Sequence, residues 1–143
     1  MVNTMILSKN YNSGRFLSEH KVVLTIPKDQ RLGIIEDGLS TIPGKLIPFS
    51  TTHPKEWFKD KDPINIFNQD VRFAGIIDSA WIDSTCPPQL IVKINIVDSD
   101  VKALIKQDKV LISYAYWRYE SLLTISSFDF DYLLVFPRRV VCQ

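Results

Sequence analysis

The sequence predicts a mainly β domain of the α+β class, a curled sheet or β-barrel of about seven strands with one clear helix. Three observations support this prediction. Short apolar runs with strand composition recur along the chain, turn residues separate them, and one segment has both the periodicity and the end signals of a helix. With 143 residues, of which 45% are hydrophobic, the chain can bury its own core, so we expect 1–143 to form a single domain.

The clear helix is expected between residues 98 and 108. Asp98 or Ser99 can cap its first turn, three apolar residues share one face, and two lysines lie near its carboxyl end. A strand follows. Its alternation places Val110, Ile112, Tyr114 and Tyr116 on one face and Leu111, Ser113, Ala115 and Trp117 on the other. Ser113 is then a small hydroxyl residue in an apolar strand, where it needs a structural hydrogen-bond partner or a base that activates it.

The other segments with strand composition are 21–26, 45–49, 71–78, 90–96, 122–126 and 128–136. Residues 1–18 mix Asn, Ser and Gly with isolated apolar residues, so we expect a partly loose amino-terminal segment. Asp37-Gly38 is interpreted as a turn, Gly75 as a bulge or a sharp bend, and Trp81 as part of a long connection between two strands.

The composition argues against several classes of function. The net charge of +1 comes from 17 basic and 16 acidic side chains without a long run of either sign, so neither nucleic acid nor a membrane is an expected partner. The two histidines and two cysteines lack zinc-site spacing, and the five glycines form no phosphate-binding loop, so we expect no metal and no cofactor. Low cysteine content and the absence of a signal-like or membrane-spanning run favour an intracellular compartment.

His53 follows a predicted strand, and Pro54 biases it toward an extended conformation at the start of a polar loop. Loops at strand ends often present reactive side chains. Taken alone, however, a loop histidine is more often a solvated surface residue, and only a partner elsewhere would make His53 a general base.

Three segments share one order and spacing. The first is LSTIPGKLIPFSTTHP, which ends at His53-Pro54. The second runs from Phe73 to Trp117 and contains G-x-I-x-x-x-W, the helix V-x-x-L-I-K and the strand ISYAYW around Ser113. The third is FDFDYLLVFP. Together they resemble the maturation (prohead) proteases of tailed bacteriophages, whose fold is related to herpesvirus assemblin. The resemblance spans residues 38 to 137.

The resemblance implies a serine endopeptidase with Ser113 as the nucleophile, His53 as the general base and Asp131 as the carboxylate that orients the histidine. Arg118, just beyond the serine strand, is a candidate for stabilising the oxyanion. The substrates would be phage capsid and scaffold proteins, cut in the host cytoplasm within the assembling procapsid. Self-cleavage, a trimmed carboxyl-terminal tail and a homo-oligomer are further expectations.

Two positions depart from the family pattern. Ala115 stands where glycine is usual, which would narrow the site beside Ser113, and Tyr132 stands where one branch has histidine. Assemblin would suggest a second histidine as the third catalytic group, and His20 is the one available. We choose Asp131 because it lies within the matched segment, whereas His20 lies outside it and is better explained as a surface residue.

Other interpretations compete with catalysis. Asp129 and Asp131 could be paired acids of a hydrolase, but residues i and i+2 of a strand equally fit a sheet edge. Trp57, Trp81 and Trp117 could line a substrate groove, although packing explains them better. The chain could also be a catalytically inactive capsid-assembly protein with the protease fold. A last alternative is an unrelated β-barrel binding module whose site is an aromatic surface patch.

Overall fold

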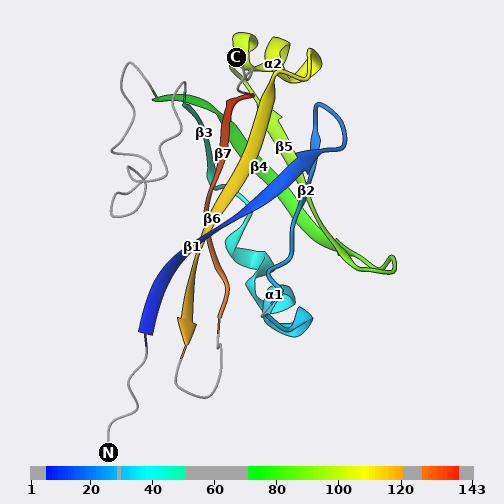
Figure 1. Ribbon diagram of the computed structural model, residues 1–143, viewed down its shortest axis with the longest axis vertical. Helices are drawn as coiled ribbons and strands as arrows, with labels where there is room; N and C mark the ends of the chain where they lie inside the picture. The colour runs from blue at the N-terminus through cyan, green and yellow to red at the C-terminus, as the bar shows by residue number, and fades with distance from the viewer. Residues whose placement is uncertain (1–5, 29, 51–70, 121–126, 139–143) are drawn as a thin grey trace, which may run out of the picture.

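The computed structural model describes residues 6–28, 30–50, 71–120 and 127–138. Seven strands close into a barrel in the order β1-β2-β5-β4-β3-β7-β6 (Figure 1). The contact between β3 and β7 is parallel and the other strand pairs are antiparallel. The strands are β1 (Ile6–Phe16), β2 (Lys21–Leu24), β3 (Leu46–Ser50), β4 (Val71–Asp83), β5 (Gln89–Ile96), β6 (Val110–Glu120) and β7 (Asp129–Pro137). The predicted mainly β barrel is therefore confirmed.

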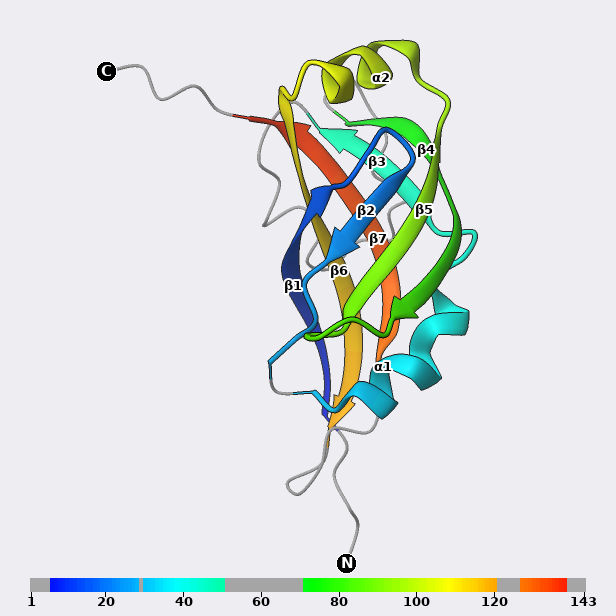
Figure 2. The same ribbon diagram turned by 90° about the vertical axis from the view of Figure 1, so that its right-hand side faces the viewer.

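The two α-helices lie at opposite ends of this barrel. Helix α2 (Ser99–Lys106) lies across one end, and α1 (Leu32–Gly38) lies beside the other, where a short 3-10 turn, η1 (Leu39–Thr41), continues it (Figure 2). None of the helices described is long and apolar enough to cross a membrane.

Alternation along the strands fills the barrel interior. In β5 the residues at even positions from Leu90 to Ile96 are buried in the core, while Lys93 and Asn95 on the other face are exposed. In β6 Val110, Ile112, Tyr114 and Tyr116 join the same core. Both patterns confirm the faces predicted from the sequence, and they fix Ser113 on the outside of the barrel wall.

The predicted helix is confirmed as α2. Its amino-terminal cap is Asp98, whose side chain accepts hydrogen bonds from the backbone N–H groups of Asp100 and Val101. Its buried residues, Val101 and Ile105, pack on the barrel core. The chain then turns at Asp108, which has a positive φ of 55°, and enters β6.

The amino-terminal segment corrects one expectation. Residues 6–16 were expected to be partly loose, but they form the 11-residue strand β1, which pairs with β6 from Ile6↔Glu120 to Gly14↔Ile112. Asn and Ser are poor strand formers. Pairing along the full length of β6 supplies the hydrogen bonds that their local preference does not, so tertiary structure overrides propensity here.

Two further expectations are corrected by the structure. The supposed turn at Asp37-Gly38 is the end of α1, which is stabilised by the full burial of Ile35. Trp81 belongs to β4, which continues to Asp83. The bulge expected from Gly75 is present beside it, because the register of β4 against β3 passes from Gly75↔Ile47 to Phe73↔Pro48 and leaves Ala74 as the extra residue. The predicted strand 122–126 lies outside the described residues.

Candidate active site

Ser113 lies on the outer face of β6, half-buried, between a residue of β1 and a residue of β7. Its directly paired neighbours are Ser13 on β1 and Leu134 on β7. The next residue on its face is Ala115, which is fully buried. Within the described part of the chain no hydrogen bond to the Ser113 hydroxyl is found, so the partner expected for a strand serine does not come from these residues.

Asp131 lies on the same side of the barrel wall. The register of β7 against β6 passes from Tyr132↔Ala115 to Phe130↔Tyr116, so Asp131 is the extra residue of a β-bulge. Because of this bulge, Phe130 points into the core and Tyr132 points outward although they are two residues apart. Simple alternation from Asp129 therefore does not describe the orientation of the Asp131 side chain.

The carboxylate of Asp131 forms an ion pair with Lys9 of β1. The Lys9 Nζ atom is 2.9 Å from Asp131 Oδ2, and the two side chains are 4% and 16% exposed. The same Nζ lies 4.9 Å from the ring centre of Tyr132 and 5.4 Å from that of Trp117. A cation between two aromatic faces and a carboxylate holds its partner in one position.

A small apolar cluster surrounds these groups on the outside of the wall. Its buried members are Val71, Ala115, Tyr132 and Leu134, with Tyr11 and Phe136 packed against them. Tyr132 is directly opposite Ala115 and diagonal to Ser113. Burial raises the pKa of the Tyr132 hydroxyl, and the neighbouring Tyr11 raises it further, so this phenol stays neutral.

The spacing between Ser113 and Asp131 follows from the strand geometry. Asp131 is on the neighbouring strand, about 4.8 Å from β6 measured across the strands. Measured along the strands, its Cα is two to three residues from the level of Ser113, which is about 7 to 10 Å. A side chain that bridges them by two hydrogen bonds would need the width of an imidazole plus about 2.8 Å at each end. The separation leaves room for a histidine between the two groups.

His53, the predicted base, lies outside the described residues, but the place where its segment begins is described. Strand β3 ends at Ser50, and β3 is separated from β6 by β7 alone. Ser50 is two strand spacings from Ser113, about 10 Å, and its register beside β7 sets it about two residues further along, so the two Cα atoms are about 12 Å apart. Three residues of chain reach at most about 11 Å, to which the length of a histidine side chain is added. The contact between His53 and Ser113 stays a prediction.

The other candidates are not brought to Ser113. Arg118 is five residues further along β6, directly opposite Ser8, and alternation puts it on the inner face, so it cannot serve as the oxyanion cation beside Ser113. His20 is exposed in the β1–β2 turn, where its backbone N–H bonds to the Ser18 hydroxyl and its carbonyl accepts the N–H of Ile94.

Sequence reasoning missed Lys9 as part of this site. The residue belongs to the segment expected to be loose, and its pairing with Asp131 depends on β1 packing beside β6 and on the bulge in β7. A metal is not indicated in the described part, where no three His, Cys, Asp or Glu side chains cluster. Comparison with protein-family models, curated proteins and solved structures finds no match.

Proposed function

We propose that the chain is a serine endopeptidase that cleaves capsid and scaffold proteins during phage prohead maturation. Ser113 would attack the scissile carbonyl, His53 would take its proton, and Asp131 would hold the imidazole in the correct tautomer. One observation carries the proposal. The described residues leave the Ser113 hydroxyl without a hydrogen bond, on the face that also holds Asp131.

Lys9 has a positioning role in this proposal. A carboxylate has two oxygens and about four acceptor sites, and Lys9 contacts Oδ2. Oδ1 is then available to accept the N–H of an imidazole. The ion pair holds the Asp131 carboxylate in one orientation, as the group behind a catalytic histidine must be held to orient the imidazole.

Labelling with a fluorophosphonate probe, followed by peptide mapping, tests the nucleophile. Ser13 is a matched control because it lies directly opposite Ser113 on the same face of the wall. We expect covalent modification at Ser113, its loss in the Ser113→Ala and His53→Ala variants, and normal labelling of Ser13→Ala. Modification at Ser13 instead, or no modification of folded, assembled protein, would contradict the proposal.

The competing function is that of a catalytically inactive capsid-assembly protein with the same fold. The observation that favours it is the ion pair of Asp131, because a carboxylate satisfied by Lys9 also makes sense as a purely structural group. Co-expression with capsid and scaffold proteins separates the two. The protease predicts truncated products that vanish in Ser113→Ala, whereas the assembly protein predicts full-length partners with both chains.

A further inference from the structure

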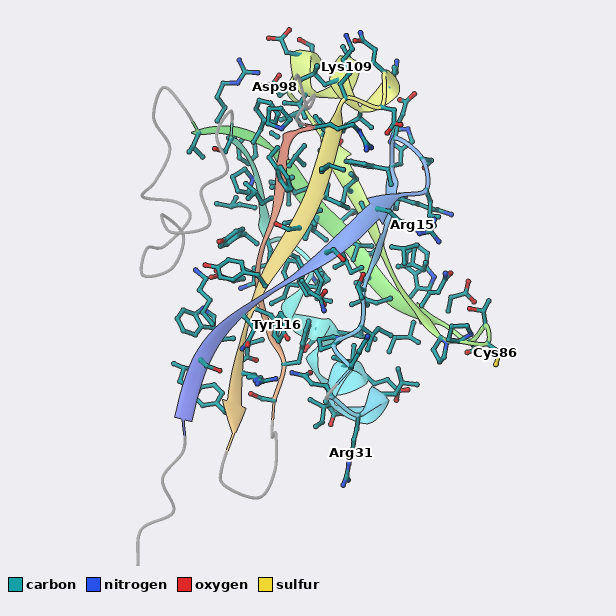
Figure 3. All side chains as sticks on the ribbon, in the orientation of Figure 1. Arg15, Arg31, Cys86, Asp98, Lys109 and Tyr116 are labelled. Carbon is teal, nitrogen blue, oxygen red and sulfur yellow. The ribbon has the colours of Figure 1, made fainter. Side chains whose placement is uncertain are left out.

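A second face of the barrel gathers an exposed indole and three cations from four strands. One row of directly paired residues crosses the four strands. It runs from Trp81 on β4 to Ile91 on β5, Val23 on β2 and Arg15 on β1. The neighbouring row pairs Lys21 with Lys93. These four strands lie side by side at the front of Figure 2, and the side of the barrel turned forward there carries Arg15 in Figure 3.

We propose that this surface, the Trp81 face (Arg15, Lys21, Lys93 and Trp81), binds single-stranded nucleic acid. It borders the Ser113 site at Arg15, which lies two residues beyond Ser13 on the same face of β1, but the proposal does not depend on protease activity. The indole would stack on a base, and the three cations would contact the flanking phosphates.

The exposure of Trp81 is the first step of the argument. Val23 and Ile91 point outward but are buried, so they form a small apolar floor beside the indole. Trp81 itself keeps 37% of its surface exposed, and Lys21 Nζ lies 5.8 Å from its ring centre. The Lys21 ammonium lies over the ring, and the rest of the indole is open to a ligand. An open ring beside a cation is suited to stacking with a base.

Charge is the second step. In the described chain no carboxylate forms an ion pair with Arg15 or Lys21, and Lys93 is 3.6 Å from Asp78 in a pair of which both members are more than half exposed. Such a pair contributes little and is easily exchanged for a phosphate. Asp83, two residues beyond Trp81, is a further carboxylate on β4. Because Asp83 would repel a phosphate, an anionic ligand stacked on Trp81 must run across the strands toward the cations on β1, β2 and β5. It cannot run along β4.

The size of the face is the third step. From β1 to β4 it spans three strand spacings, about 14 Å, which suits a short stretch of extended strand rather than a single phosphate. The overall charge of +1 gives no sign of this surface, because the cations are distant in sequence and the strand register brings them together. The proposal thus departs from the expectation, based on composition, of no nucleic-acid partner.

Fluorescence anisotropy of labelled dT12 and U12 with the full chain, from low to physiological salt, tests the proposal. We expect saturable binding at low salt. Trp81→Leu, which keeps an apolar cover over the floor, should weaken it on the order of 5- to 100-fold. Lys21→Gln should lower the slope of log K against log salt by about 0.7.

The matched controls are Phe73→Leu and Lys102→Gln. Phe73 is another exposed aromatic residue of β4, at 39%, and Lys102 is an exposed lysine of α2, which is not one of the four strands of the Trp81 face. Both variants should bind like the parent chain. No saturable binding by folded protein, equal binding by Trp81→Leu, equal losses in the controls, or equally strong competition by polyglutamate would each overturn the proposal.

Discussion

Replacing Lys9 with methionine tests the ion pair that organises the outer wall. The change removes the cation but keeps an unbranched side chain between the rings of Tyr132 and Trp117, so the apolar contacts are largely kept. It leaves the Asp131 carboxylate without its partner. Removing one member of a buried pair costs about 3 to 5 kcal/mol, and because Asp131 keeps 16% of its side-chain surface we expect the lower end, about 3 kcal/mol.

Urea denaturation followed by circular dichroism measures this cost without any assumption about activity. For a chain of 143 residues, about 3 kcal/mol corresponds to a fall in Tm of roughly 10 °C. The double variant Lys9→Met/Asp131→Asn should recover more than half of the loss, since the uncompensated charge is gone.

Lys93→Met provides the control for the Lys9 variant. The Lys93–Asp78 pair is 3.6 Å long, with side chains 53% and 57% exposed, so its removal should cost less than about 1 kcal/mol. If Lys9→Met cost no more than Lys93→Met, the structural role assigned to the Lys9–Asp131 pair would be wrong.

Further outcomes follow from the glycine environments, the cap of α2 and the burial of Tyr114. Gly75→Ala should destabilise the barrel strongly because its new Cβ would lie 2.2 Å from the Asn95 carbonyl oxygen, whereas Gly33→Ala, with open space around it, should raise the urea midpoint by the equivalent of about 0.5 to 1 kcal/mol. Asp98→Ala should cost about 1 to 2 kcal/mol in the same assay, since two N–H groups of α2 lose their acceptor. Burial raises the pKa of the Tyr114 hydroxyl, so above about pH 10 the unfolded chain releases a proton that the folded chain retains. The free energy of unfolding should therefore fall as the pH rises. The Tyr114→Phe variant lacks this hydroxyl, so its free energy of unfolding should fall less steeply between about pH 9 and 11.

The elements that the sequence predicts well are those in which local signals and tertiary packing agree. The cap at Asp98 and the alternation from Val110 to Tyr116 both appear in the structure as predicted. In these segments helix signals or β-branched and aromatic residues specify the element, and burial of one face reinforces it.

The elements that were missed depend on contacts distant in sequence. Strand β1 contains Asn and Ser residues and is held by β6, about 100 residues away, while α1 is short and depends on burying Ile35 at the end of the barrel. The end of α1 also packs closely, because a Cβ on Gly38 would lie 2.2 Å from the carbonyl oxygen of Phe128. A glycine in that place looks like a turn residue when only its neighbours in sequence are considered.

The candidate site was predictable in part. The outward position of Ser113 follows from the two-residue period of β6. The orientation of Asp131 does not follow from a period, because a bulge is specified by the register of two strands and has no signature in the residues of β7 alone. The ion pair with Lys9 depends on both that bulge and the unexpected strand β1.

The distance between His53 Nε2 and Ser113 Oγ in a crystal structure of the intact chain tests the central claim most directly. The proposed mechanism predicts about 2.6 to 3.2 Å, or a somewhat longer contact without substrate, with the imidazole on the outer face between Ser113 and Asp131. An ordered His53 side chain that points to another side of the barrel would contradict the serine-protease proposal.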